Sequence, residues 1–392
     1  MLLDQLESLN EAKLQKLCDE SYEESVTLDF KRELPGTSDK DKQEFLKDVC
    51  AFANADGGDL VYGITEQSGV AKLLSPIANV TETSDAAKRR LGQVLERGLE
   101  PRIQGALFYP IQTAGGYILV VRVPASFDGP HRYLFDGQSK FVMRNGTHTS
   151  ELSYDQLRWA FDRTATLGER ARQFRSNRLQ AVVEGKTWRP MTAGPICAVH
   201  LIPIASMSGR KSIDIRALYY DYVRFISPDW GGGSRTLNLD GLVIHLGESN
   251  GNGALAFTQV FRSGALEALR HGGWATEPKK RSIPSSTITT FFRDTILKFI
   301  KDGKSFGFTG QAVIGAALLF ADGYELGLPS ALNSGYRPIA DRDHLILPEV
   351  WLDSIDVEDP DSVVRPLLDM LWQSFGVERC HSYDKQGVWT ST

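Results

Sequence analysis

Three carboxylates and one lysine near the start of the chain have the types and spacing of a site for chemistry on phosphates. Glu24, Asp29 and Lys31 lie in the run ESVTLDFK, and Glu66 follows the run AFANADGGDLVYGIT. Hard cations such as Mg²⁺ and Mn²⁺ prefer oxygen ligands and keep several waters, so two or three carboxylates are enough to hold one. Such an ion polarises a phosphate oxygen and lowers the pKa of an attacking water, while an ammonium offsets charge that develops at phosphorus. These residues predict a catalytic site in which Glu24, Asp29 and Glu66 hold the ion and Lys31 assists.

Two predicted strands would bring these side chains together. Residues 24–31 alternate, with Leu28 and Phe30 on one face and Asp29 and Lys31 on the other. Residues 51–66 are typical of a helix end, a glycine turn and a buried strand that Glu66 follows. If the two strands are neighbours in one sheet, the three carboxylates meet at one edge.

One geometric condition and one alternative accompany this prediction. Glu24 and Asp29 have opposite parity on a strand, so they converge only if Glu24 precedes the strand or a β-bulge intervenes. The alternative is that the three carboxylates are ordinary surface acids at strand ends. The run Asp-Phe-Lys at residues 29–31 also has the D-x-K form of restriction-type nucleases.

The two runs resemble the Schlafen AlbA_2 domain, a nucleic-acid-binding domain of bacterial proteins and of vertebrate Schlafens. The resemblance continues through PHRYLFDG and FVMRNGTHT and covers about residues 20–165. In the nuclease members, three acids carry metal-dependent RNA cleavage, and by resemblance they correspond to Glu24, Asp29 and Glu66. This chain has Asp at the second position and Glu at the third, so the reach of each carboxylate changes by one methylene.

The resemblance implies a metal-dependent endoribonuclease with Mg²⁺ or Mn²⁺ as cofactor, a tRNA-like RNA as substrate and phage defence as its context. The alternative is a non-catalytic, nucleic-acid-binding transcriptional regulator that keeps the fold without cleavage. Cleavage of a labelled RNA with and without EDTA separates the two hypotheses.

A second group of residues is predicted to bind nucleic acid. Arg132, Tyr133, Lys140 and Arg144 fall on the last strands predicted for this region. Basic and aromatic side chains gathered on such strands would form an edge that grips phosphates and bases.

The distribution of charge restricts how nucleic acid can be bound. Residues 1–165 hold 19 Lys and Arg against 25 Asp and Glu, a net charge of −6, whereas a general electrostatic grip needs a basic domain. Contact must therefore come from a local basic stripe or from metal ions that bridge carboxylates to phosphate. Residues 166–190 carry +4, with Arg172, Arg175 and Arg178 on one helical face. We interpret them as a solvated connecting helix, with a nucleic-acid or partner contact as the alternative.

The chain is predicted to be α+β, with an AlbA_2-like domain over residues 1–165, a basic connecting helix over 166–190 and a regulatory or sensor domain of mixed α/β type over 191–392. In the first domain we expect a mixed or antiparallel sheet with packed helices. The predicted helices are residues 39–54, 86–98, 154–163 and, after an interruption at Gly168, 166–189; the further strands are 102–109, 117–123 and 140–144, and 67–85 is a loop. In the second domain the predicted strands are 196–204, 213–223, 239–246, 255–261 and 344–352, and the helices are 263–269, 287–301 and 360–375.

Compartment and assembly are predicted from coarser features. The N-terminal residues have no basic segment or cleavage site of a signal peptide, and the longest apolar run, residues 312–320, is too short to cross a bilayer. We therefore expect a cytoplasmic protein. The resemblance implies that vertebrate Schlafens use two related lobes around RNA, whereas AFAN-x-x-GG occurs once here. Because two-fold pairing would supply the second lobe, we expect a homodimer, with the C-terminal domain contributing to the contact.

Overall fold

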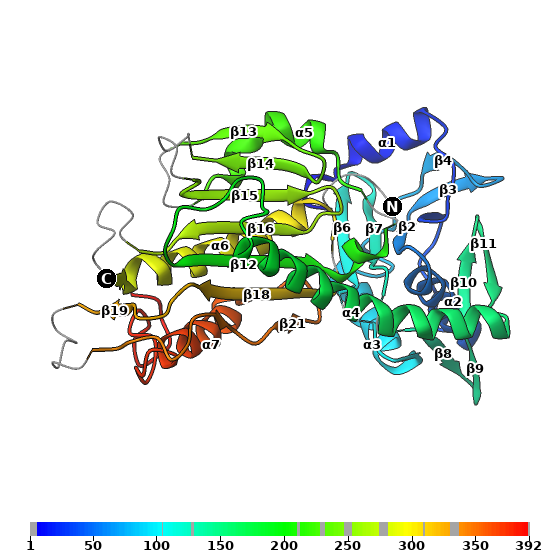
Figure 1. Cartoon of the computed structure of the whole chain (residues 1–392). Helices are drawn as coiled ribbons and strands as arrows, with labels where there is room; N and C mark the ends of the chain where they lie inside the picture. Colours follow the sequence, from blue (N-terminus) through cyan, green and yellow to red (C-terminus); the bar gives the residue numbers. More distant parts are fainter. Residues whose placement is uncertain are drawn as a thin grey trace. The chain divides into compact units, whose positions relative to one another are not determined.

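A computed structural model describes residues 6–103, 105–126, 129–209, 212–227, 232–246, 253–273, 281–308, 310–329 and 337–390. The chain divides into two compact units, Met1–Gly168 with Gly307–Gln311 and Glu169–Phe306 with Ala312–Thr392. Figure 1 shows both units with their helices and strands. The predicted α+β class is confirmed. No helix in the described part of the chain combines the length and the apolar character needed to cross a bilayer.

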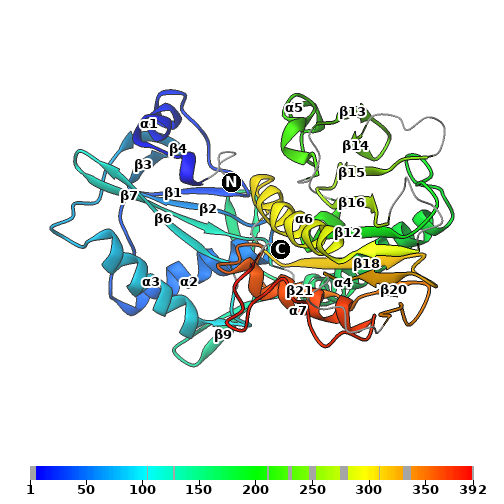
Figure 2. The ribbon, with the colours of Figure 1, turned by 90° about the vertical axis from the view of Figure 1, so that its left-hand side faces the viewer.

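The first unit is built on a mixed sheet. Its strands are β1 (Leu28–Lys31), β2 (Gly58–Tyr62), β7 (Gly116–Val123) and β6 (Leu107–Thr113), in that order. β1 and β2 are neighbours, as the predicted meeting of carboxylates requires, and they are parallel, while β7 is antiparallel to both β2 and β6. Helix α1 (Glu11–Asp19) covers one face of the sheet, and α2 (Asp39–Asn54) and α3 (Ser84–Gly98) cover the other (Figure 2).

Helix α2 has the bounds predicted from its cap and its apolar pattern. The Ser38 hydroxyl accepts a hydrogen bond from the backbone N–H of Asp41 and so satisfies one orphan donor of the first turn. Phe45, Val49 and Phe52 recur at helical spacing and are buried against the sheet. Burial of each such side chain stabilises the fold by about 1.5–3 kcal/mol.

The run AFAN-x-x-GG is fixed by packing. Gly57 has φ of 71°, and a Cβ built on Gly58 would lie 2.3 Å from Cδ1 of Phe52, so the turn needs glycine at both positions. The Asn54 side chain accepts from the backbone N–H of His131 at 2.7 Å and donates to the carbonyls of His131 and Val142. This residue therefore ties the end of α2 to the segment that carries the predicted nucleic-acid-binding residues.

Several predicted bounds in the first unit are wrong. The first strand begins at Leu28 because residues 24–27 form a turn, and β6 begins at Leu107 and not at residue 102. The predicted loop over 67–85 contains β4 (Val70–Leu74), which pairs with β3 (Ile64–Gln67). The predicted strand 140–144 is broken at Phe141, because its two ends join different sheets. The strands of these sheets are β5 (Leu99–Glu100), β8 (Arg132–Phe135) and β9 (Gln138–Lys140) in one, and β10 (Val142–Asn145) and β11 (His148–Glu151) in the other.

The two helices predicted over 154–163 and 166–189 are one helix, α4, which has no interruption and ends six residues earlier than predicted. It spans Tyr154–Val183 and continues through Gly168, although Ser153 and Gln156 do cap its start as expected. One glycine inside a helix costs only about 1 kcal/mol relative to alanine, which the packing of so long a helix outweighs.

The second unit is built on an antiparallel sheet between helical layers. The strand order is β13-β14-β15-β16-β12-β18-β20, and β21 also pairs with β18. Figure 1 shows the strands from β13 to β18 in this order. Leu179 and Val182 of α4 pack on one face of this sheet, and α6 (Ser285–Ser305) packs on the other, where Gly303 lies against Leu201. Helix α7 (Pro360–Gln373) adjoins α6 through a hydrogen bond from Trp372 to Thr289. The strands are β12 (Ile196–Pro203), β13 (Ser234–Leu237), β14 (Gly241–His245), β15 (Ala256–Phe261), β16 (Leu266–His271), β18 (Ala312–Leu319), β20 (Leu345–Ile346) and β21 (Val350–Leu352), with a parallel pair β17 (Ser282–Pro284) and β19 (Glu325–Gly327) beside them.

Two elements predicted in the second unit have the wrong type, and one is divided. Residues 213–223 form α5 (Ile215–Tyr220), which Asp214 caps, followed by a 3-10 turn, and not a strand. The predicted helix 263–269 is largely β16, whose residues are almost all buried and therefore show no two-residue alternation. The predicted strand 344–352 is the separate pair β20 and β21.

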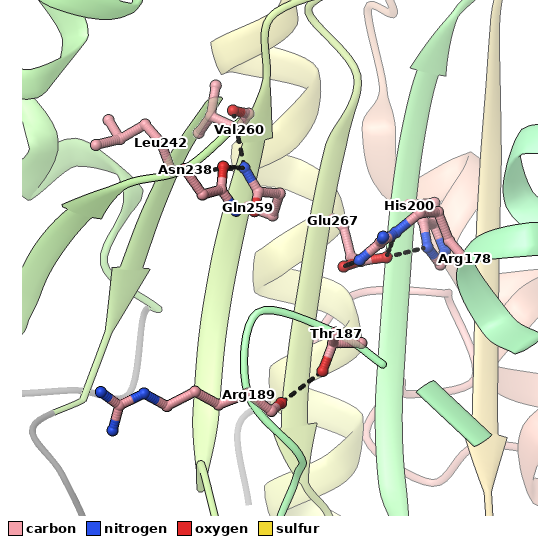
Figure 3. A network of polar contacts seen from close by, with 9 residues as sticks. All are labelled: Arg178, Thr187, Arg189, His200, Asn238, Leu242, Gln259, Val260 and Glu267. Carbon is pink, nitrogen blue, oxygen red and sulfur yellow. Dashed lines mark hydrogen bonds and ion pairs between the residues drawn. The ribbon is translucent and has the colours of Figure 1, made fainter. Parts of the chain in front are cut away.

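Arg175 and Arg178 of α4 are not solvated as predicted, whereas Arg172 is exposed. Arg178 makes two hydrogen bonds, of 2.9 and 2.8 Å, to the buried carboxylate of Glu267 on β16, to which His200 of β12 also donates at 3.0 Å (Figure 3). Arg175 is 5% exposed and donates to the carbonyls of Ala316 and Leu347. A Cβ built on Gly315 would lie 2.3 Å from Nε of Arg175, so this glycine leaves the space that the arginine fills.

Candidate functional site

A polar cavity of about 580 Å³ in the first unit contains the predicted catalytic residues. All of its lining side chains except Phe30 are polar or charged. They are Glu24, Asp29, Phe30, Lys31, Arg32, Lys47, Asp48, Thr65, Glu66, Arg144, Thr147, His148 and Thr149. They come from β1 and the residues on either side of it, from α2, from β3 and from the β10–β11 hairpin.

The alternation of β1 decides which of its side chains reach the cavity. Leu28 and Phe30 are buried in the cluster that includes α1 residues. Asp29 and Lys31 alternate with them and therefore lie on the sheet face that α2 covers. This confirms the two faces predicted for residues 28–31.

Glu24 precedes the strand, which meets the condition under which Glu24 and Asp29 can converge. The backbone N–H of Phe30 donates to its Oε1 at 3.0 Å. Burial raises the pKa of Glu24 to about 7, a side-chain hydrogen bond with Asp29 adds to this rise, and the Phe30 N–H opposes it. Asp29 is thus one of the groups that raise the pKa of Glu24, and both carboxyl groups line the cavity.

Glu66 lies on β3, exposed, at the rim of the same cavity. Its Oε2 accepts a hydrogen bond of 2.7 Å from the backbone N–H of Gly69. Its negative charge also raises the pKa of Glu24, although burial and the neighbouring Asp29 and Phe30 have larger effects on this pKa. The structure thus gathers Glu24, Asp29, Lys31 and Glu66 around one cavity.

Two residues of α2 also line this cavity, and the sequence did not single them out. The Asp48 carboxylate is 3.5 Å from Nζ of Lys31, which is itself 3.3 Å from Asp29. Burial raises the pKa of Asp48 to about 6, although the Lys31 ammonium opposes the rise. The second residue is Lys47. The sequence signal that could have identified Asp48 is its place one turn before Phe52, on a helix face that is otherwise apolar.

Arg144 closes the cavity from strand β10. It is 5% exposed, and its Nη1 donates to Asp29 at 3.0 Å. Its guanidinium also lies 4.7 Å from the ring centre of Phe52. Arg144 is therefore an ion-pair partner of Asp29 within the wall, while its predicted contact with nucleic acid stays a prediction.

Replacement of Arg144 should destabilise the first unit. Arg144→Ala leaves Asp29 buried without its guanidinium, and breaking a buried pair in this way costs about 3–5 kcal/mol. Urea unfolding would measure the change. Arg132→Ala is the matched control because its partner Glu100 is 55% exposed, and an exposed pair contributes at most about 1 kcal/mol. Equal losses in the two variants would contradict the anchoring role.

The other predicted nucleic-acid-binding residues lie elsewhere. Arg132 pairs with Glu100 at 2.6 Å, and Lys140 pairs with Glu151 at 3.2 Å. Tyr133 is 4% exposed and belongs to the hydrophobic core. None of the three lines the cavity, so the structure does not bring them together with Arg144.

The region that holds the cavity matches a known family. Residues 24–153 match the family described as "Schlafen, AlbA_2". These residues form a Schlafen AlbA_2 domain. The resemblance predicted from ESVTLDFK and AFANADGGDLVYGI is confirmed over this range, and the cavity residues named above lie within the AlbA_2 domain.

Other comparisons are more distant. The N-terminal domain of an ATP-dependent DNA helicase RecG-related protein from Nitrosomonas europaea is 22% identical, with a TM-score of 0.27, over 36% of this chain and 95% of that one. A protein from Corynebacterium diphtheriae is 16% identical, with a TM-score of 0.25, over 36% of this chain and 26% of that one. No curated protein matches the chain.

The cavity of the AlbA_2 domain fits a divalent ion held by two carboxylates. Glu24 and Asp29 both line this cavity, and Mg²⁺ commonly uses one or two carboxylates with waters and substrate phosphates. Among the residues that the structure describes, no group of three or more His, Cys, Asp or Glu is arranged to hold a metal ion. The ligand roles of Glu24, Asp29 and Glu66 stay predictions.

Proposed function

We propose that the AlbA_2 domain binds RNA in this cavity and cleaves it as a metal-dependent endoribonuclease. The observation that carries the proposal is that Glu24 and Asp29 line one cavity with polar walls, with the Lys31 ammonium 3.3 Å from Asp29. A tRNA-like substrate and a context of phage defence are the finer parts of the proposal, and they rest on the family resemblance alone.

Each residue has a distinct part in this proposal. Glu24 and Asp29 would hold Mg²⁺ or Mn²⁺, which when bound supplies Lewis-acid activation of phosphate and water. Lys31 faces the cavity with a side chain that is 33% exposed, and its ammonium would neutralise charge on a phosphate oxygen. Arg144 holds Asp29 in place from the wall.

The test is cleavage of a labelled tRNA transcript by the full chain. We expect cleavage with Mg²⁺ or Mn²⁺, loss of cleavage when EDTA is added, and recovery when the ion is restored in excess. Cleavage that continues unchanged in EDTA would contradict a metal-dependent mechanism.

A specific observation favours a second candidate, a nucleic-acid-binding transcriptional regulator without cleavage. The Asp29 carboxylate is already neutralised by Arg144 at 3.0 Å and Lys31 at 3.3 Å, which weakens its attraction for a further cation. Retained binding of RNA or DNA, with no cleavage in either Mg²⁺ or Mn²⁺, would favour this candidate.

Pairing of two chains is a further prediction. A second AlbA_2 domain would widen the surface available to a folded RNA, and two-fold pairing is the commonest association of soluble chains. We expect light scattering at micromolar protein concentration to give the mass of a dimer. A monomer mass that does not change when RNA is added would rule out this pairing.

A further inference from the structure

The charges that line the cavity are balanced. Four carboxylates face four cations, although the region around them is strongly acidic. Most of the cations are already engaged. Lys31 and Arg144 pair with Asp29, and Arg32 lies 3.8 Å from the exposed carboxylate of Glu33.

Lys47 is the exception. In the described part of the chain its side chain makes no ion pair or hydrogen bond, and it is half-buried at the cavity. It comes from the middle of α2, where the rigid helix fixes its backbone. Its neighbour Asp48 contacts Lys31 at 3.5 Å, so α2 supplies one ammonium directly and holds a second through a carboxylate.

Asp48 is placed to fix the position of Lys31. Asp48 is 8% exposed, and its position on the buried face of α2 leaves its side chain few accessible rotamers. Lys31 lies between two carboxylates, Asp29 on its own strand and Asp48 across from it. A flexible lysine held from both sides keeps its ammonium in one place.

We propose that Lys47 and Lys31 form a subsite for a phosphodiester of the RNA strand beside the Glu24–Asp29 pair, and that Asp48 is a positioning residue for Lys31. This inference rests on the proposed function in one respect, namely that the cavity takes RNA. The subsite holds the strand through its phosphate, and each lysine that neutralises a phosphate releases counterions.

The experiment measures RNA binding in EDTA, where cleavage does not interfere. Affinity of the full chain for a fluorescein-labelled tRNA transcript is followed by anisotropy between about 50 and 200 mM NaCl. We expect Lys47→Gln and Lys31→Gln each to weaken binding and to reduce the slope of log K against log salt by about 0.7–0.9. Lys40→Gln is the matched control, because Lys40 is exposed on the same helix outside the cavity, and its slope should equal that of the wild type.

The positioning role of Asp48 has its own readout. In an Asp48→Asn background, Lys31→Gln should change the slope by clearly less than it does in the wild type, whereas Lys47→Gln should keep its full effect. If Asp48 only supported the fold, Asp48→Asn would alter the slope changes caused by Lys31→Gln and by Lys47→Gln to the same extent. An unchanged effect of Lys31→Gln in that background would overturn the positioning role.

The outcomes separate this subsite from the nuclease proposal. Wild-type slopes for Lys47→Gln and Lys31→Gln overturn the subsite, even if the wild type cleaves RNA with Mg²⁺. Reduced slopes support the subsite, even if no ion brings about cleavage and the nuclease proposal fails. Absence of RNA binding by the wild type in EDTA overturns the subsite as well.

Discussion

Glu24→Gln should abolish metal-dependent RNA cleavage while leaving the stability of the chain almost unchanged. The amide oxygen of glutamine can still accept the hydrogen bond from the Phe30 N–H, but the charge that holds a divalent ion is lost. We expect a loss of more than about 100-fold, because even residues that only support metal ligands contribute about 10–100-fold. Gel analysis of labelled RNA at saturating Mn²⁺ would measure it.

Glu24 is a better test of the site than Asp29. Asp29→Asn would also break the buried pair with Arg144, so loss of activity would be mixed with loss of folding. Glu23→Gln is the matched control, since Glu23 is the exposed neighbour of Glu24 and does not line the cavity. If Glu24→Gln and Glu23→Gln cleave RNA equally well, Glu24 has no place in the mechanism.

Glu267→Gln should destabilise the second unit by about 3–5 kcal/mol, because it leaves the guanidinium of Arg178 without its buried counter-charge. The Glu267 side chain has no exposed surface and accepts from both Arg178 and His200. Urea unfolding at neutral pH would measure the loss. Glu184→Gln is the control, since Glu184 pairs with Lys186 at the surface, and surface substitutions usually change stability little.

The same carboxylate predicts a response to acid. Burial alone would raise the pKa of Glu267, but the hydrogen bonds from His200 and Arg178 outweigh it and lower this pKa to about 2 from its usual 4.5. A carboxyl group whose pKa is lower in the folded than in the unfolded state stabilises the fold when it is ionised. This stabilisation is therefore fully present above the unfolded-state pKa of about 4.5 and is lost as the pH falls towards 2. The difference between wild type and Glu267→Gln should shrink over this window. A difference that stays constant from pH 5 to pH 2 would contradict the pairing.

The parts of the AlbA_2 domain that follow local rules could be predicted from the sequence. Helix α2 has its predicted bounds because the Ser38 cap and the apolar spacing act within one helix. The faces of β1 follow from the two-residue period of a strand. The same period places Asp29 and Lys31 together on the face opposite Leu28 and Phe30.

Contacts between distant segments could not be predicted. Arg144 and Asp29 are 115 positions apart, and only the folded β10–β11 hairpin brings them together. Asp48 joins the cavity because β1 and α2 pack on each other, which no local pattern shows. Strand β16 was mistaken for a helix because it is buried on both faces and has no period to read.

Gly315 constrains which sequences this fold accepts. Its missing side chain is the space that Arg175 occupies above β18, with Nε of the arginine only 2.3 Å from where a Cβ would stand. Any larger residue at position 315 would push the guanidinium away from the carbonyls of Ala316 and Leu347. Conversely, a shorter residue at position 175 would leave the space beside Gly315 unfilled and the carbonyls of Ala316 and Leu347 without the hydrogen bonds from Arg175. A substitution at either position therefore needs a matching change at the other, although they are 140 positions apart in the chain.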